Sequence, residues 1–277
     1  LVTRDRAEAE AFAAECLEGG RFGESGRHVV VEAFLEGEEA SVMAVCDGER
    51  FVLLAPARDH KRAFDGDQGP NTGGMGAFAP VPEVDAALER TIGTRIVAPV
   101  LREMAARGTP YRGVLYVGLM LGPSGPRVVE FNARLGDPEA EAILPITGGS
   151  LARLFASAAA GQLDATAVTR EPGAVVCVVL VDRDYPAKPS GLGCIQGLEG
   201  ITDEAVTVFH AATASMPGGW RITGGRSVHV CARAADIAAA RERVYHAIAG
   251  LGGTGWRVRA DIARGVGPAR TRVPATD

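Results

Sequence analysis

The sequence predicts an α+β fold in which a mixed region of helices and strands precedes a β-rich region. Three observations support this prediction: apolar positions at helical spacing over 83–107, strand-like apolar runs paired across short turns before residue 133, and short apolar runs after Ala174. A polar stretch with a proline separates the two patterns at about 162–173. We therefore expect one domain over residues 1–165 and a smaller, β-rich domain over 166–277.

The elements of the first region follow from periodicity and turn residues. The turn between the strand-like runs of 39–56 is Asp47-Gly48, a favoured hairpin pair. In chain order we expect an amphipathic helix over 4–18, a buried strand over 28–34, a hairpin over 39–56, an irregular glycine-rich loop over 58–80, a long helix over 83–107, a second hairpin over 111–121 and 127–132, and helix over 138–161.

The second region is dominated by short apolar runs that predict strands. We expect a buried strand over 174–181, further strands over 206–211, 227–232 and 256–260, and one helix over 236–249.

Composition excludes several classes of protein. The formal net charge is −5, so the chain lacks the basic surface that nucleic-acid binding requires. Its longest apolar run, 173–181, is too short to span a membrane, and its first residues have no apolar secretory core. Five scattered cysteines without a CxxC pair predict reduced thiols, and five histidines without HxxxH or HExxH spacing argue against zinc. We expect a cytoplasmic protein with no nucleic-acid or membrane partner.

The sharpest local signal is VVEFNARLGDPE (128–139). Because side chains alternate along a strand, Glu130 and Asn132 point the same way, while Val129 and Phe131 should face the core. A carboxylate and an amide oxygen so placed can bind a hard cation such as Mg²⁺. The alternative is an edge strand with its polar face in solvent, followed by a helix cap.

Two further segments could bind a nucleotide or an anion. After the strand predicted over 28–34, backbone amides could read a purine, with Phe34 and Leu35 as apolar walls and Glu39 accepting hydrogen bonds from ribose. The stretches DHKR (59–62) and GPNTGGMGAF (69–78) offer glycines for an anion-binding backbone, with neither a Rossmann nor a Walker spacing. A plain strand–turn–strand and a mobile surface loop are the alternatives.

Taken together and in this order, the segments resemble the ATP-grasp ligases, and among them the glycinamide ribonucleotide synthetase (phosphoribosylamine–glycine ligase) family of purine biosynthesis. The resemblance extends over essentially the whole chain. It rests on residues 32–41, 59–62, 69–78, 128–139, 208–213, 223–230 and 259–266. It implies an ATP-grasp fold, incomplete at its N-terminus, with a C-terminal domain that packs on the site.

The resemblance also implies a reaction and its residues. ATP would phosphorylate the carboxylate of glycine, and the amine of 5-phosphoribosylamine would attack the glycyl phosphate, giving glycinamide ribonucleotide, ADP and phosphate. By position it assigns Glu130 and Asn132 to Mg²⁺ or Mn²⁺, Glu32, Ala33, Phe34, Leu35 and Glu39 to ATP, Asn71, Thr72, Gly73, Gly74, Asp137 and Glu139 to glycine and 5-phosphoribosylamine, and Arg134 and Lys61 to catalysis.

The chain also departs from that family. Related chains carry an N-terminal segment with a lysine-bearing, glycine-rich loop that binds the nucleotide phosphates, whereas this chain has only Lys61 and Lys188. Residues 181–186 lack the usual glycine before Tyr-Pro, and 117–119, which should face the Glu130 strand, offer no further metal carboxylate. Two alternatives stay open: an inactive nucleotide-binding fragment, or a ligase for another substrate whose missing segment is supplied by a separate chain.

Overall fold

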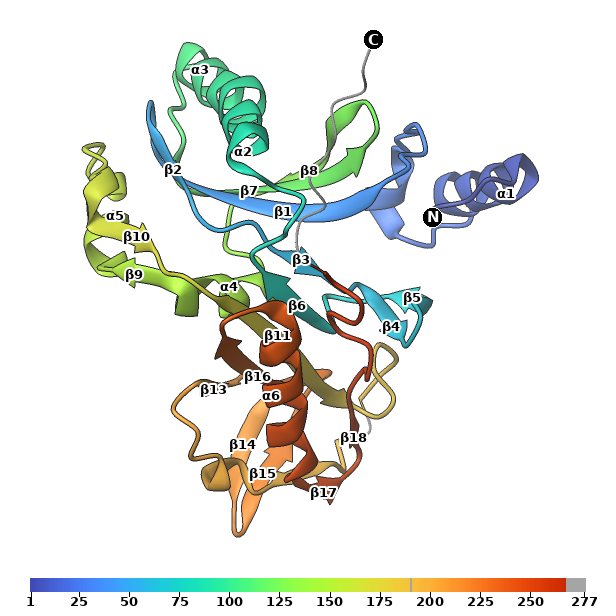
Figure 1. Ribbon diagram of the computed structural model, residues 1–277. Coiled ribbons are helices and arrows are strands. Elements are labelled where there is room, and N and C mark those ends of the chain that lie inside the picture. The colour runs from blue at the N-terminus through green and yellow to red at the C-terminus, as the bar shows by residue number, and fades with distance from the viewer. Residues whose placement is uncertain (190, 268–277) are drawn as a thin grey trace. The chain divides into compact units, whose positions relative to one another are not determined.

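A computed structural model describes residues 1–189 and 191–267, so residue 190 and the last ten residues of the predicted second domain lie outside the described residues. The chain forms two compact units (Figure 1). One consists of Leu1–Glu38 with Met120–Arg127, and the other of Glu39–Leu119 with Val128–Asp277. The predicted adenine-binding residues therefore belong to the first unit, and all other predicted site residues belong to the second.

The first unit begins with a helix that confirms the prediction over 4–18. This helix, α1 (Arg6–Leu17), is capped by Asp5, whose carboxylate accepts hydrogen bonds from two backbone N–H groups of the first turn. A 3₁₀ turn, η1 (Gly23–Arg27), follows it.

The buried strand predicted over 28–34 is wrong. The segment belongs to no strand, and the side chain of Val31 is 90% exposed. β-Branched residues favour a strand because they pack well on a pleated, half-covered surface, and the preference is not a property of the backbone alone. In the part of the chain that the structure describes, this apolar run has no neighbouring strand with which to pair.

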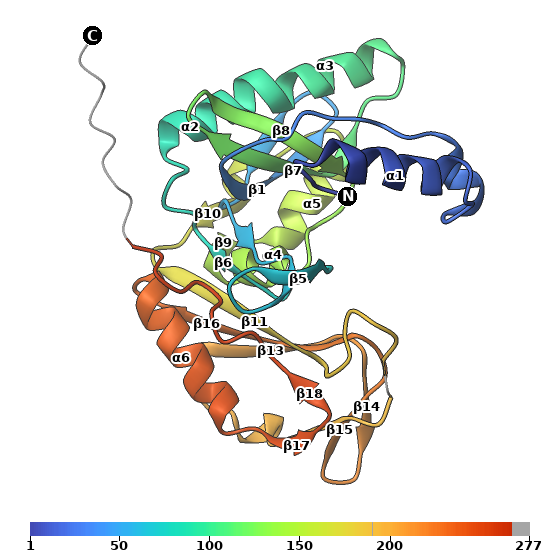
Figure 2. The ribbon, with the colours of Figure 1, turned by 90° about the vertical axis from the view of Figure 1, so that its right-hand side faces the viewer.

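Most of a four-stranded sheet lies in the second unit, and this sheet confirms both predicted hairpins. Two helices, joined by a π-helical segment (Gly93–Val97), lie along one face of this sheet and confirm the helix predicted over 83–107 (Figures 1 and 2). The strand order is β2 (Phe51–Leu53), β1 (Glu38–Asp47), β7 (Arg112–Gly122), β8 (Gly125–Asn132), and the helices are α2 (Ala86–Ile92) and α3 (Ala98–Ala106).

The turn between β1 and β2 is held by the buried carboxylate of Asp47. It accepts hydrogen bonds from the backbone N–H groups of Glu49, Arg50 and Leu163 and from the Arg50 guanidinium. Burial opposes ionisation of this carboxylate, but the donors outweigh it and lower the pKa of Asp47 to about 2. The ionised group therefore stabilises the fold above pH 3.8, and this contribution is lost as the pH falls towards 2.

We expect Asp47→Ala to lower the free energy of unfolding at pH 7 by about 2 kcal/mol, the value of the pKa shift converted to energy. Near pH 2 the difference from the parent chain should vanish. Urea unfolding between pH 7 and pH 2 measures both quantities, with Glu49→Ala, an exposed neighbour, as the control. A loss that is the same at every pH would contradict the assignment.

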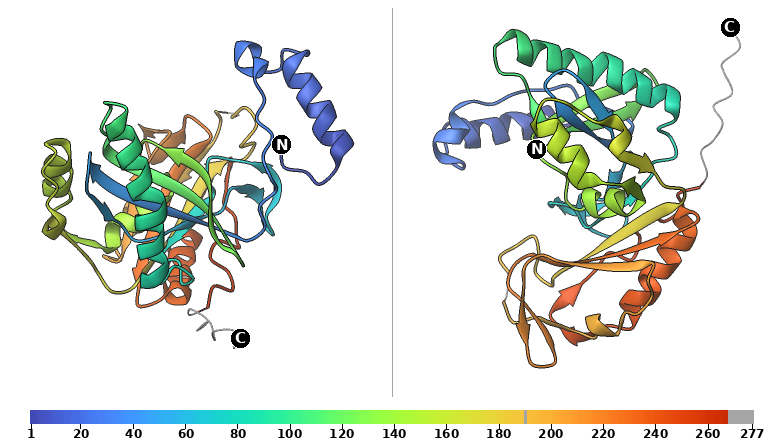
Figure 3. Two further views of the ribbon diagram at one scale, coloured as in Figure 1. Left: turned by 90° about the horizontal axis from the view of Figure 1, so that it is seen from above. Right: turned by 90° about the vertical axis from the view of Figure 1, so that its left-hand side faces the viewer.

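A six-stranded antiparallel sheet forms the second layer of this unit. All nine residues of its central strand, β11, are buried, and α6 (Ile237–Ala249) packs along β11 and β16 (Figures 2 and 3). The order is β13 (Val206–His210), β16 (Arg226–Ala234), β11 (Ala174–Asp182), β6 (Gly76–Ala79), β3 (Arg58–Asp59), and β18 (Trp256–Arg257) also pairs with β11. The strands predicted over 174–181, 206–211 and 227–232 and the helix over 236–249 are confirmed.

The irregular loop predicted over 58–80 is wrong. It contains β3 and β6 of the large sheet and a small hairpin of β4 (Arg62–Phe64) and β5 (Gln68–Asn71). Strands of two to four residues are too short for a period of two to be visible. In β6 the close approach of β11 demands glycine, because a Cβ on Gly76 would lie 2.6 Å from the carbonyl oxygen of Cys177.

The helix predicted over 138–161 is interrupted. α4 (Glu139–Ile143) ends in a 3₁₀ turn, η3 (Leu144–Ile146), because Pro145 cannot continue an α-helix. A short strand, β9 (Thr147–Gly149), precedes α5 (Leu151–Ala159), which Ser150 caps. The remaining elements are β10 (Val168–Arg170), which pairs with β9, the turns η4 (Ala165–Ala167) and η5 (Leu198–Gly200), and a small sheet of β14 (Thr213–Met216), β15 (Gly219–Ile222), β12 (Cys194–Gln196) and β17 (Gly252–Thr254), which the sequence did not predict.

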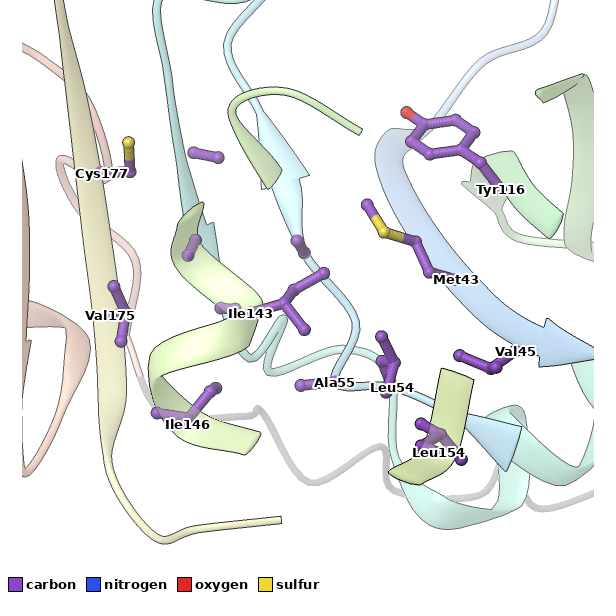
Figure 4. Packing of buried hydrophobic residues seen from close by; sticks show 14 of the residues in the cluster. Met43, Val45, Leu54, Ala55, Tyr116, Ile143, Ile146, Leu154, Val175 and Cys177 are labelled. Carbon is purple, nitrogen blue, oxygen red and sulfur yellow. The ribbon is translucent and has the colours of Figure 1, made fainter. Parts of the chain in front are cut away.

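An apolar cluster joins the two sheets of the second unit. Ile143 of α4 lies between Val175 on β11 and Met43 on β1, and all three side chains are fully buried (Figure 4). This packing fixes α4, and with it the turn that follows β8. None of the helices in the described ranges has the length and apolar character needed to cross a bilayer.

Candidate functional site

The predicted metal pair lies on β8, the edge strand of the four-stranded sheet. Glu130 and Asn132 are two residues apart on this strand and so share one face. Neither side chain makes a hydrogen bond or ion pair with any residue that the structure describes, so both oxygens remain available. The prediction that Val129 and Phe131 face the core is wrong, because both are 43% exposed. On this edge strand both faces are open.

The stretch predicted to face the Glu130 strand does so. Gly118 on β7 lies beside Glu130, and a Cβ added there would come within 3.1 Å of the Glu130 Cγ. The glycine leaves room for the Glu130 side chain but supplies no oxygen ligand.

Lys61 and Glu39, which sequence reasoning assigned to separate roles, form an ion pair. The Lys61 Nζ donates to Glu39 Oε2 at 2.6 Å and lies 3.8 Å from Asp59 Oδ1. Burial lowers the pKa of Lys61, but the charges of Asp59, Glu39 and Glu130 outweigh this effect and raise it. Lys61 is therefore a fixed cation among three carboxylates.

Asp59 is a site residue that the sequence analysis did not single out. Its side chain is only 5% exposed, and burial together with the nearby charge of Glu139 raises the pKa of Asp59 to about 7, in spite of Lys61. The one sequence signal was its place in DHKR (59–62). A buried carboxyl that titrates near neutrality is typical of functional sites.

Glu139 is the buried carboxylate whose charge acts on Asp59. Its Oε1 accepts hydrogen bonds from Tyr116 at 2.7 Å and from Ser41 at 3.1 Å, and the carboxylate is buried. A Cβ on Gly136 would lie 2.6 Å from Glu139 Oε2, so a larger residue there would displace this carboxylate. The predicted contact of Glu139 with substrate stays a prediction, while its contacts tie the start of α4 to β1 and β7.

The four residues predicted to bind substrate from the glycine-rich stretch form a tight turn after β5. The Thr72 backbone N–H and hydroxyl both donate to the carbonyl of Lys61, and the Gly74 N–H donates to the Thr72 hydroxyl oxygen. The N–H of Gly73 donates to the hydroxyl of Tyr185 at 3.0 Å. Asn71 ends β5 with its side chain exposed.

Asp137 is joined to this turn by residues of β16. Its Oδ1 accepts a hydrogen bond from Arg226 at 2.8 Å and lies 2.9 Å from His229 Nε2, while Arg226 also donates to the Gly73 carbonyl. Burial opposes ionisation, but His229 and Arg226 outweigh it and lower the pKa of Asp137. Arg134, which is exposed, adds to this effect and donates to the Leu135 carbonyl.

Arg226, His229 and Tyr185 were missed as individual residues. The two β16 residues belong to the segment 223–230 that carried the resemblance, but their contacts with Asp137 are about ninety residues away in sequence.

In the first unit, the segment Glu32–Leu35 belongs to no helix or strand and is mostly exposed. The Arg4 guanidinium lies 4.6 Å from the centre of the Phe34 ring and pairs with Glu36. One face of the Phe34 ring, which was predicted to contact adenine, is thus covered by Arg4, a residue that precedes α1.

Comparison with known proteins adds the family to this geometry. Residues 1–140 match the phosphoribosylglycinamide synthetase ATP-grasp (A) domain, and residues 175–265 match the phosphoribosylglycinamide synthetase C domain. The chain belongs to the phosphoribosylglycinamide synthetase family. The α+β ATP-grasp fold followed by a C-terminal domain, expected from the resemblance, is confirmed for this family member.

Relatives of the phosphoribosylglycinamide synthetase family support this placement. The chain is 44% identical over 264 residues to a phosphoribosylamine–glycine ligase of Caulobacter vibrioides and 47% identical over 249 residues to one of Phenylobacterium zucineum. These matches cover 95% and 89% of this chain, and the chain spans only 62% and 59% of the relatives.

Solved structures agree with the family assignment. A phosphoribosylamine–glycine ligase of Thermotoga maritima matches with a TM-score of 0.82 and 33% identity, over 95% of this chain and 65% of that one. The biotin carboxylase domain of a thermophilic 2-oxoglutarate carboxylase matches with a TM-score of 0.64 and 16% identity, over 92% and 55%, which shows a shared fold alone.

Proposed function

We propose that this chain binds ATP with Mg²⁺ or Mn²⁺ and serves the ligation of glycine to 5-phosphoribosylamine. In this reaction a glycine carboxylate oxygen attacks the γ-phosphorus and ADP leaves. The amine of 5-phosphoribosylamine then attacks the glycyl carbon, loses a proton and expels phosphate, which leaves glycinamide ribonucleotide. The names of the relatives support this proposal. The observation that carries it is the pair of free oxygens on one face of β8.

The residues present fit a divalent cation. Mg²⁺ prefers oxygen ligands and usually completes its shell with water and phosphate. Glu130 and Asn132 offer one carboxylate and one amide oxygen without internal partners, and Gly118 opposite them adds none. The phosphates of the nucleotide would therefore supply further ligands. Bound there, the metal would neutralise negative charge on the phosphoryl group being transferred.

The other predicted site residues would mainly position the substrates and neutralise negative charge on the phosphoryl group. Lys61, held by Glu39, is a cation in the same cluster, and Arg134 is an exposed guanidinium beyond the end of β8. Asn71 to Gly74, with Asp137 held by Arg226, would bind glycine and 5-phosphoribosylamine. Glu32 to Leu35 would bind adenine, as the resemblance implies.

We also propose the division into two domains that the sequence predicted, because it follows from the same family resemblance. Residues 1–165 would carry the ATP-grasp part and residues 166–277 the C-terminal domain, in a protein that acts in the cytoplasm. The turn 71–74 and Asp137 would receive their positions from the second of these segments, through Tyr185 and Arg226.

The test is a calorimetric titration of the chain with Mg²⁺ and a non-hydrolysable ATP analogue. We expect Glu130→Gln to weaken binding at least roughly tenfold, because a metal ligand is lost. The matched control is Glu199→Gln, an exposed glutamate that accepts a hydrogen bond from Trp220 and should have no effect. Equal losses in the two variants, or no binding by the parent chain, would contradict the proposal.

A further inference from the structure

Three potential metal ligands meet in the second unit, and none of them belongs to the β8 pair. One atom each of Asp137, Glu141 and His229 lies within 4.8 Å of the other two. The three residues come from the turn after β8, from α4 and from β16, so no local spacing motif in the sequence predicts the cluster. This explains why the histidine spacing in the sequence argued against such a site.

The side chain of Glu141 is unusual among these three. Its Oε2 is buried and has no hydrogen-bond partner among the residues that the structure describes. An unsatisfied polar atom away from water is costly, and most such atoms in proteins have a partner. A ligand absent from the protein chain itself would satisfy this oxygen.

His229 and Asp137 are in direct hydrogen-bond contact, which a bound ion would replace. The His229 side chain is 2% exposed, and its Nε2 lies 2.9 Å from Asp137 Oδ1. Arg226 donates to the same carboxylate and to two backbone carbonyls, of Gly73 and of Asp137 itself, so it holds the carboxylate in place. Outer contacts of this kind orient metal ligands.

We propose that Asp137, Glu141 and His229 form a binding site for a divalent transition metal of the zinc class. Two carboxylates balance the charge of such an ion, and an imidazole nitrogen favours Zn²⁺ or Co²⁺ over Mg²⁺. Three protein ligands would leave a coordination position open, as in catalytic zinc sites. The site shares Asp137 with the proposed substrate-binding residues, but Glu141 and His229 have no part in the proposed function, and the nucleotide metal is assigned to Glu130 and Asn132.

A proton is the competitor of the metal. Burial raises the pKa of the Glu141 carboxyl and so favours its protonated form when no ion is bound. If Glu141 is simply protonated and binds no metal, glutamine replaces the neutral acid without loss. Glu141→Gln should then leave every response to added metal unchanged. The experiment therefore has to compare metal responses and not stability alone.

The test uses the full chain, freed of metals with EDTA and titrated with Co²⁺ alone, without nucleotide. We expect one Co²⁺ to bind with a visible absorption band, Zn²⁺ to displace it, and excess Mg²⁺ to leave it in place. Glu141→Gln and His229→Asn should each weaken Co²⁺ binding at least roughly tenfold. Zn²⁺ should also raise the Tm of the parent chain and not that of Glu141→Gln.

Two control variants keep the result specific. His246→Asn removes an exposed histidine of α6, and Glu130→Gln removes the proposed nucleotide-metal ligand. Both should bind Co²⁺ like the parent chain. Equal Co²⁺ binding in all four variants, or a loss confined to Glu130→Gln, would overturn the proposal. Should His229→Asn fail to fold, the isosteric Glu141→Gln still decides.

Discussion

Replacing Asp59 with asparagine is expected to raise the free energy of unfolding at pH 8 by about 4 kcal/mol and to change it little at pH 4. The pKa of the Asp59 carboxyl is raised to about 7 by burial and by the charges of Glu139 and Glu39. An acid whose pKa is higher in the folded state destabilises the fold as the pH rises above its unfolded value of 3.8. The full penalty is reached above pH 7.

The charges around Asp59 give this prediction an internal check. Glu139 and Glu39 raise the Asp59 pKa, and Lys61, 3.8 Å away, lowers it. We therefore expect Lys61→Met to lose more stability at pH 8 than at pH 4. Asp85→Asn is the matched control, because Asp85 is an exposed N-cap of α2 and asparagine caps a helix equally well.

Guanidinium unfolding at the two pH values measures these differences. Destabilisation by Asp59→Asn at pH 8, or an equal change at pH 4 and pH 8, would show that the carboxyl is not a buried, uncompensated acid.

A stabilising substitution in this cluster would also bear on function. Burying an acid near the charges of Glu139 and Glu39 reduces stability, and sites that bind charged ligands often carry such strain. If the proposed nucleotide site is right, Asp59→Asn should weaken binding of the Mg²⁺-loaded ATP analogue while it stabilises the fold. A variant that gained stability with unchanged binding would mark Asp59 as structural.

The sequence predicted those elements whose signal is local and long. The periodic helix over 83–107 and the hairpin at Asp47-Gly48 needed no tertiary information, and alternation along β8 sufficed to place Glu130 and Asn132 on one face. The same alternation placed Val129 and Phe131 in the core and failed, because it cannot tell an edge strand with two open faces from a covered one.

Other features depend on contacts that no window of sequence contains. Asp137 meets Arg226 and His229 across about ninety residues. The raised pKa of Asp59 arises from burial between strands and from Glu139, eighty residues further along the chain. The family resemblance brought the right segments together, but it did not say which side chains within them would touch.

Arg259→Ala is expected to lower the free energy of unfolding by about 4 kcal/mol, within the range for breaking a buried ion pair. The guanidinium is 1% exposed and donates to both oxygens of Asp261, to Asp67 and to the carbonyl of Arg62. Removing it leaves the Asp261 carboxylate, only 13% exposed, without its cation. Arg259→Lys should recover part of the loss, because one ammonium cannot replace the planar fork.

Replacing Arg259 should also loosen the structure locally, at the β4–β5 hairpin, which distinguishes its effect from a general loss of stability. Through Asp67 and Arg62 the guanidinium holds the β4–β5 hairpin, and Asp261 accepts a hydrogen bond from the Gly66 N–H at the tip of that hairpin. The hairpin leads directly into the turn at 71–74. Hydrogen exchange of the Gly66 amide should therefore accelerate in Arg259→Lys more than exchange in the β11 amides.

The control is Arg264→Lys, since Arg264 is exposed and makes one long hydrogen bond to the Ala260 carbonyl. It should change neither the free energy of unfolding nor exchange at Gly66. If Arg259→Lys and Arg264→Lys behave alike, the buried guanidinium does not hold the hairpin. In that case the turn at 71–74 must take its position from Tyr185, in the turn after β11, and from Arg226 on β16.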